Sequence, residues 1–85
     1  MLPRVSVIVP AYNSENTIGR CLSAIEAQDY PLRLYEVIVV DDGSRDGTAE
    51  VIKGRVVKYF WQTNKGPATA RNKGVEKATG EIILF

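Results

Sequence analysis

Histidine is absent from this 85-residue sequence, and Cys21 is its single cysteine. Without histidine, Ser-His-Asp and Cys-His catalysis and His-ligated metals are excluded within the chain. A single cysteine excludes an internal disulfide and a multi-cysteine zinc site, and we expect Cys21 to be a small core residue. Apolar runs such as Val37–Val40 are far shorter than the roughly 20 residues that span a bilayer. The N-terminus lacks a signal-peptide pattern, so we expect an intracellular, reducing setting.

An excess of charge of one sign is also missing. Eleven Lys and Arg residues against ten Asp and Glu residues give a net charge of +1. A near-neutral chain has no electrostatic footprint for nonspecific nucleic-acid binding, so we expect no nucleic-acid partner. The hydrophobic share of 45% is ordinary for a globular protein. The length suits one small domain or a piece of a larger one.

Short runs rich in Val and Ile alternate with segments that suit helices. Strands are predicted at residues 5–9, 36–40, 56–61 and 81–85, and helices at about 15–27, 48–53 and 67–77. Asn13 or Ser14 is expected to cap the first helix through its side-chain oxygen. The apolar stripe of that helix is predicted at Ile18, Leu22 and Ile25, and the weaker apolar face of the third helix at Ala70, Val75 and Ala78.

The order β-α-β-α-β-α-β predicts an α/β fold, with an open parallel sheet and helices on both faces. Each crossover should be right-handed. If strands one, two and three step outward in one direction, strand four returns to pair beside strand one, and the spatial order 3-2-1-4 follows. The order reverses between strands one and four, and ligands bind beyond the carboxyl ends of strands at such a reversal. The segments that follow the strands are therefore the candidate site: residues 10–13, 41–44 and 64–71.

Common nucleotide-binding and metal-binding motifs do not fit these segments. The turn after the first strand, residues 10–15, has no glycine, so the dinucleotide-binding Gly-x-Gly-x-x-Gly motif is missing, and a P-loop is absent too. The segment starting at Asp42 resembles the beginning of a calcium loop, but Lys53 stands where that loop needs a bidentate Glu.

What remains is an aromatic ring, a carboxylate pair and a guanidinium in three separate loop regions. A flat base could stack on Tyr12, and Asp42 could accept the N3–H of uracil, a donor that cytosine lacks. Arg71 is a planar donor that could reach a base edge or a phosphate. Each residue also has an ordinary explanation: Tyr12 could pack over the first helix, Asp41 and Asp42 could belong to a capped turn, and Arg71 could be a solvated charge. Tyr59 and Trp61 are expected to be packing residues.

Three segments in order resemble the amino-terminal nucleotide-binding half of a family 2 glycosyltransferase with the GT-A fold, a Rossmann-like half domain. They are residues 5–13, 36–48 and 64–72, so the resemblance covers nearly the whole chain. Arg45 stands where the family often has Thr. The resemblance implies that the base site is lined by Pro10, Ala11 and Tyr12, that Asp42 contacts the base with Asp41 supporting that loop or the ribose, and that Arg71 lies over the nucleotide.

The resemblance also implies a reaction: inverting transfer of a sugar from a nucleotide-sugar donor, with UDP favoured, to an acceptor that the sequence does not identify. Guanosine and thymidine donors occur in similar families. The Mg²⁺ or Mn²⁺ of the family is held by an Asp-x-Asp motif that would follow Phe85, so neither metal ligands nor a catalytic base are expected within the chain.

We therefore expect residues 1–85 to form a single nucleotide-sugar-binding subdomain with negligible transferase activity by itself. Exposed sheet edges predict self-association. A cytoplasmic location is expected, with membrane attachment through downstream segments left open. One alternative is a non-catalytic nucleotide-binding or folding module. A second is a sugar nucleotidyltransferase, which would need a Gly-rich basic signature after strand one. A third is a receiver domain, which would carry its acidic pair after the first strand and not after the second.

Overall fold

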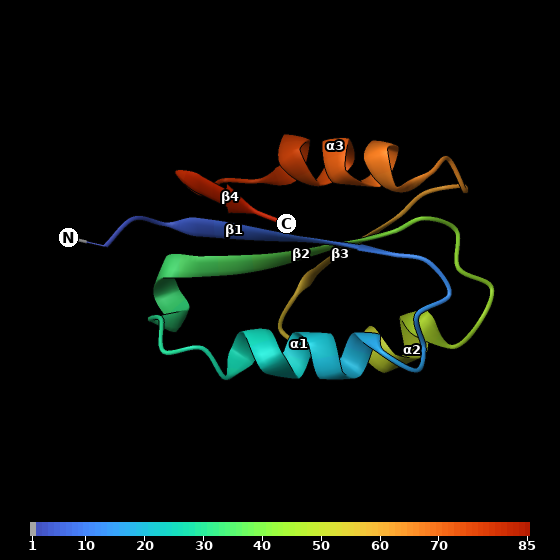
Figure 1. Ribbon diagram of the computed structural model, residues 1–85, viewed down its shortest axis with the longest axis horizontal. Helices are drawn as coiled ribbons and strands as arrows, with labels where there is room; N and C mark the ends of the chain where they lie inside the picture. Colours follow the sequence, from blue (N-terminus) through green and yellow to red (C-terminus); the bar gives the residue numbers. More distant parts are fainter. Residues whose placement is uncertain (1) are drawn as a thin grey trace.

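A central sheet of four parallel strands lies between two layers of helices (Figure 1). The computed structural model describes residues 2–85. The longest helix has 11 residues, and no helix among the described residues is long and apolar enough to cross a membrane. In chain order the elements are β1 (Val5–Ala11), α1 (Ile18–Glu26), the 3-10 turn η1 (Leu32–Leu34), β2 (Tyr35–Asp41), α2 (Thr48–Ile52), β3 (Lys58–Trp61), α3 (Pro67–Lys77) and β4 (Ile82–Leu84).

The strand order is β3-β2-β1-β4, which confirms the predicted order 3-2-1-4. All three pairings are parallel, and the register places Ala11 opposite Asp41 and Asp41 opposite Trp61. The carboxyl ends of β1, β2 and β3 therefore share one edge of the sheet, on the right in Figure 1. The edges of the sheet are β3 and the short strand β4, which pairs only with residues 5–7 of β1.

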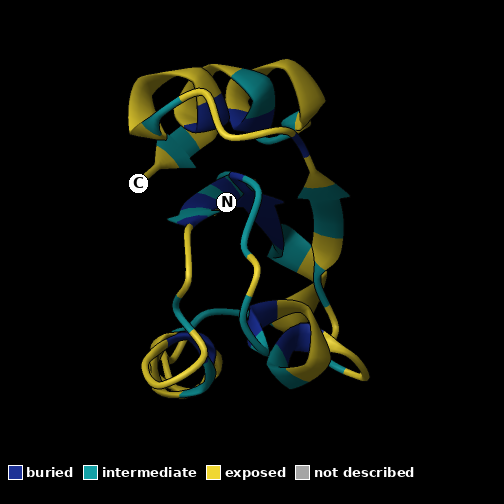
Figure 2. Cartoon of the chain, turned by 90° about the vertical axis from the view of Figure 1, so that its right-hand side faces the viewer, coloured by how far each residue is buried: buried dark blue, intermediate teal, exposed yellow. Residues whose placement is uncertain are grey.

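Alternation along the two central strands fills two separate hydrophobic clusters, one on each face of the sheet. Helices α1 and α2 cover one face and α3 covers the other, and the buried residues gather between these layers (Figure 2). The buried members on the α1 and α2 side are Val9, Ala11, Ile18, Leu22, Val37, Val39 and Ile52. Those on the α3 side are Ile8, Ile38, Val40 and Ala70.

Strand β1 continues through Pro10, whereas the sequence predicted that proline ends the strand. The carbonyl oxygen of Ala11 accepts the N–H of Asp42 on the β2 side. The carbonyl oxygen of Arg4 accepts the N–H groups of Glu81 and Ile82 on the β4 side. Because successive residues of a strand point to opposite neighbours, Pro10 faces the β4 side. Strand β4 has already ended there, so the missing N–H of Pro10 costs no hydrogen bond.

The predicted start of the first helix was wrong. Helix α1 begins at Ile18 with Thr17 as its N-cap, and no side chain caps it. The residues before it form a turn in which the Ser14 carbonyl accepts the N–H groups of Thr17 and Ile18. The side-chain oxygen of Asn13 accepts the N–H of Arg45 instead of a helix N–H.

Three packing predictions were also wrong. Cys21 is exposed, because α1 turns Ile18 and Leu22 toward the sheet and leaves Cys21 on its flank. Val75 is exposed, and the buried residues of α3 are Ala70 and Gly74. Trp61 is half-exposed at the end of the edge strand β3.

A polar network fixes the connection between α3 and β4 under the α3 face of the sheet. The Glu36 carboxylate accepts hydrogen bonds from the Lys58 ammonium at 2.6 Å, from the Ser6 hydroxyl at 2.6 Å and from the backbone N–H of Thr79 at 2.7 Å. The Gly80 N–H donates to the Ser6 hydroxyl at 2.8 Å. The Glu36 carboxylate therefore connects Ser6 of β1 and Lys58 of β3 to the loop between α3 and β4.

Candidate functional site

The three loops that follow β1, β2 and β3 meet at the carboxyl edge of the sheet (Figure 1). The N–H of Asp42 donates to the carbonyl of Ala11 at 2.8 Å, and the N–H of Gln62 donates to the carbonyl of Asp41 at 2.9 Å. These bonds extend the strand pairing by one residue on each side. The chain therefore leaves all three strands at one place.

The loops after β1 and β2 are fastened together by what we name the loop latch, residues 13–15 with residues 44–48. The N–H of Asn13 donates to the hydroxyl of Ser44 at 2.8 Å, and the N–H of Arg45 donates to Oδ1 of Asn13 at 2.9 Å. The N–H of Ser14 donates to the hydroxyl of Thr48 at 2.7 Å. Asn13 adopts a φ of 47°, a left-handed conformation that asparagine tolerates better than most residues.

Asp41 points to the α1 side of the sheet and is buried. Its Oδ1 accepts the N–H of Ser44 at 2.8 Å, and its Oδ2 accepts the hydroxyl of Tyr59 at 2.6 Å. Burial and then the neighbouring Asp41 carboxylate raise the pKa of Tyr59 above its usual value, so the phenol keeps its proton and donates. The contacts of Asp41 support the loop after β2, and Tyr59 is partly buried as a packing residue.

Asp42 is 4% exposed and accepts hydrogen bonds at both carboxylate oxygens. Oδ1 accepts Nε2 of Gln62 and the N–H of Lys65, both at 2.8 Å. Oδ2 accepts the N–H of Gly66 at 2.9 Å and Nδ2 of Asn64 at 3.1 Å. The bonds from Gln62 and from the N–H of Lys65 lower the pKa of Asp42 against the effect of burial, and the Gly66 bond lowers it further. Asp42 is therefore a carboxylate that organises the segment leading into α3.

Two glycines allow this segment to approach Asp42 so closely. Gly43 has a φ of 81°, and a Cβ there would lie 2.8 Å from the backbone nitrogen of Asn64. Gly66 has a φ of 101°, and Pro67 follows it as the first residue of α3, where the missing N–H of proline is tolerated. The sequence Asn-Lys-Gly-Pro thus builds the entry to α3 against Asp42.

The remaining predicted site residues lie on adjoining elements. Tyr12 is 52% exposed directly after β1, and Arg71 is exposed in the first part of α3. Among residues 2–85, neither the Tyr12 hydroxyl nor the Arg71 guanidinium forms a hydrogen bond or an ion pair, so both are available to a ligand. Pro10 is partly buried, and the methyl group of Ala11 belongs to the core, which leaves mainly its backbone for a ligand.

Gln62 is a site residue that the sequence reasoning missed. It is buried beside Asp42, yet one glutamine after an aromatic strand carries no signal in the sequence. Asn64 and Gly66, by contrast, fell within the segment that was expected to face the ligand.

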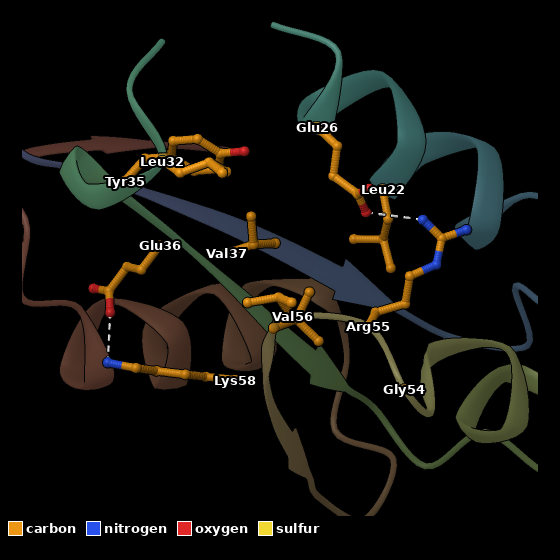
Figure 3. Close-up of a pocket in the computed structure, with 11 residues that line it drawn as sticks. Leu22, Glu26, Leu32, Tyr35, Glu36, Val37, Gly54, Arg55, Val56 and Lys58 are labelled. Carbon is orange, nitrogen blue, oxygen red and sulfur yellow. Dashed lines mark hydrogen bonds and ion pairs between the residues drawn. The ribbon is translucent and has the colours of Figure 1, made fainter.

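Two cavities lie away from this edge. The larger, of about 730 Å³, is a groove between α1, the start of β2 and the segment before β3 (Figure 3). Two ion pairs flank it, Glu26 with Arg55 and Glu36 with Lys58. The smaller, of about 240 Å³, lies beside β1 and β4. Neither cavity is lined by a predicted site residue.

Comparison with known proteins identifies the family. The model of glycosyl transferase family 2 matches residues 6–85. The glycosyltransferase AglE of Haloferax volcanii is 42% identical over 90 residues, which cover 99% of this chain and 30% of AglE. The poly(ribitol-phosphate) β-N-acetylglucosaminyltransferase TarS of Staphylococcus aureus is 38% identical over 88 residues, which cover 96% of this chain and 15% of TarS.

Solved structures show the same arrangement. Residues 1–349 of TarS in complex with UDP-GlcNAc match 96% of this chain and 25% of that chain, with a TM-score of 0.87 and 39% identity. The mannosyltransferase PcManGT of Pyrobaculum calidifontis in complex with GDP-Man and Mn²⁺ matches 98% of this chain and 26% of that chain, with a TM-score of 0.85 and 37% identity. The chain thus spans 30% or less of these relatives. With its GT-A-like sheet and its match over nearly the whole length, the chain belongs to glycosyl transferase family 2.

Proposed function

We propose that residues 1–85 form the donor-binding unit of an inverting glycosyltransferase that takes a nucleoside-diphosphate sugar, with uridine as the favoured base. The observation that carries this proposal is the buried Asp42 carboxylate at the carboxyl edge, tied to the entry of α3 in a member of this family. The complexes of TarS with UDP-GlcNAc and of PcManGT with GDP-Man support a nucleotide-sugar as the ligand class.

The base is proposed to stack on Tyr12 and to donate its N3–H to Asp42. All four donors to Asp42 are in place, so the base must displace one of them. Asn64 is the donor most readily displaced, because it is exposed, its bond of 3.1 Å is the longest, and the same Nδ2 also donates to the Asp42 carbonyl. Cytosine has no N3–H and presents an acceptor to the carboxylate instead, so UDP should bind more tightly than CDP.

The diphosphate is proposed to lie near Arg71. Its guanidinium stands in the first part of α3, where it has no partner among the described residues, and a planar fork of donors suits phosphate oxygens. An exposed cation on the helix that Asp42 anchors would thus bind the charged end of the same nucleotide.

PcManGT was solved with Mn²⁺ as well as GDP-Man, so a metal is the next component to consider. Among residues 2–85, no group of three or more Asp, Glu, His or Cys side chains could hold a metal ion. The residues described therefore supply no ligand set of this kind for the Mg²⁺ or Mn²⁺ of the family. Nucleotide binding by this chain should be largely insensitive to Mn²⁺.

Calorimetric titration with UDP, GDP, CDP and dTDP, with and without Mn²⁺, tests the proposal. We expect weak binding in which UDP is favoured. Asp42→Ala should abolish the preference for UDP over CDP. A wild-type chain that binds none of the four nucleotides, or an Asp42→Ala variant that keeps the preference, would overturn the assignment.

The contribution of Arg71 is tested with a matched pair of variants. Arg71→Ala should weaken the binding of UDP about tenfold and leave the binding of uridine unchanged, because the guanidinium addresses the phosphates. Lys53→Ala removes the same charge from the exposed C-cap of α2 and should change neither affinity. Equal losses in both variants would show that only overall charge matters.

Transfer itself is proposed to need parts that these residues do not supply. The chain spans 30% or less of its relatives, and the base for the acceptor hydroxyl is proposed to lie outside residues 2–85. We expect negligible sugar transfer by the 85-residue chain with UDP-GlcNAc as the donor. Metal-dependent transfer by the purified chain would refute this.

A further inference from the structure

Gln62 is the donor to Asp42 that lies deepest in the structure. Its side chain belongs to a residue that is 8% exposed, and its Nε2 lies 2.8 Å from Oδ1 of Asp42. Its own N–H donates to the carbonyl of Asp41, which continues the pairing of β2 with β3 beyond Trp61. The sheet therefore holds Gln62 in place, and Gln62 holds one oxygen of the carboxylate.

The two oxygens of Asp42 consequently differ in their surroundings. Oδ1 is bound by the buried Gln62 and by the N–H of Lys65 at the same distance. Oδ2 is bound by the N–H of Gly66 and by the exposed amide of Asn64 at the longer distance of 3.1 Å. One oxygen is thus retained by the protein, and the other is the oxygen that a ligand could reach by replacing Asn64.

We propose that Gln62 is a positioning residue for base recognition: it retains Oδ1 of Asp42, so that Oδ2 is presented to the N3–H of the base. This inference rests on the proposed nucleotide-binding function and deepens it. Gln62 acts through Asp42 and need not touch the nucleotide. Its effect should therefore fall on the choice of base more than on the contacts to phosphate.

Replacing Gln62 by Leu removes the donor and keeps a side chain of similar size. Oδ1 of Asp42 then keeps only the N–H of Lys65 as a donor, so the orientation of the carboxylate, and with it the position of Oδ2, is held less tightly. We expect Gln62→Leu to weaken UDP binding about tenfold and CDP binding much less, so that the ratio of the two affinities approaches one. A purely structural loss would weaken both nucleotides by the same factor.

Replacing Gln62 by Glu keeps the length of the side chain but places two carboxyl groups against each other. At about pH 8 both are ionised and repel, whereas a single proton shared at lower pH restores a donor to Asp42. We expect the UDP affinity of Gln62→Glu, divided by that of the wild type at the same pH, to rise about tenfold between about pH 8 and pH 5.5. The ionisable residues next to the pair are Asp41, which precedes Asp42 and binds Tyr59, and Lys65, whose N–H donates to Asp42. They are common to both proteins, so the ratio removes their contribution and that of the UDP phosphates.

The experiment measures UDP and CDP affinities of the wild type and of both variants by calorimetry across this pH range. The amide resonances of Lys65 and Gly66, whose N–H groups donate to Asp42, report on the carboxylate without any ligand and should move with pH in Gln62→Glu but not in the wild type. Should Gln62→Leu fail to fold, the Gln62→Glu profile decides alone.

Three outcomes are distinguishable. A lost UDP preference in Gln62→Leu, together with the acid-dependent recovery of Gln62→Glu, supports the proposal. Equal losses for UDP and CDP, or a Gln62→Glu ratio that is flat with pH, overturn it while the nucleotide site stands. A wild-type chain that binds no UDP overturns the proposed function, and the role of Gln62 falls with it.

Discussion

Glu36 allows a quantitative test of how the polar network under α3 contributes to stability. Its side chain is 12% exposed and is bound by Lys58, Ser6 and Thr79. Burial alone would raise the pKa of Glu36, but these hydrogen bonds outweigh it and lower the pKa from 4.5 to about 2. At about 1.4 kcal/mol for each pKa unit, the full difference corresponds to about 3 kcal/mol. Because Lys58 is half-exposed and its charge is screened by solvent, we expect Glu36→Gln to cost about 2 kcal/mol.

The pH dependence gives the prediction its sign. The pKa is lower in the folded state than in the unfolded state, so the stabilisation is present above about pH 4.5 and is lost as the pH falls toward about 2. The difference in unfolding free energy between wild type and Glu36→Gln should be about 2 kcal/mol at about pH 7 and less than about half of that at about pH 3.

Urea denaturation followed by circular dichroism at several pH values measures this difference. Glu81→Gln is the matched control, because Glu81 is exposed and its side chain makes no hydrogen bond or ion pair with the described residues. The control should change stability by less than about 0.5 kcal/mol. A Glu36→Gln effect that stays constant between about pH 7 and pH 3 would refute the reasoning.

Two further predictions concern packing and a partly buried hydrogen bond, and both are checked by urea denaturation at neutral pH. Gly74→Ala should destabilise the protein by about 1–3 kcal/mol, because a Cβ on this face of α3 would overlap the side chain of Ile8. Gly19→Ala on α1, where the nearest atom is 3.4 Å away, should be neutral or stabilise by up to about 1 kcal/mol, and equal effects in the two variants would contradict the packing argument. Tyr59→Phe removes the donor to Asp41 and should cost about 1–2 kcal/mol, so an unchanged midpoint would show that the bond contributes nothing.

The strand order could be predicted from the sequence because it depends on rules that act on whole elements. Right-handed crossovers leave few arrangements for four apolar runs separated by helical segments. The order 3-2-1-4 follows when strands one to three step in one direction and strand four returns beside strand one. The same rules place Asp41, Asp42 and the residues before α3 at one edge, since parallel strands end on the same side of a sheet. The order of the elements was therefore almost sufficient to predict that these residues lie at one edge of the sheet.

Details that depend on one side chain meeting another could not be predicted. Asn13 was expected to cap α1, but Arg45, 32 residues further along, supplies the N–H that its oxygen accepts. The apolar face of α3 was predicted at Ala70, Val75 and Ala78; Ala70 is buried as expected, but Gly74, in close contact with Ile8, is buried in place of Val75. The contact of Gln62 with Asp42 could not be predicted either, because it arises only when β3 pairs beside β2. Each of these outcomes follows from a long-range contact and from no local pattern.

The loop latch has a consequence for protein engineering. Residues 13–15 and 44–48 exchange backbone N–H groups and side-chain oxygens in both directions across the edge of the sheet. Replacing one of the two loops by that of a relative, without replacing the other, would leave polar groups without the hydrogen-bond partners that they have in this structure. A change of nucleotide preference by loop exchange should therefore succeed only when both segments are moved together as one cassette.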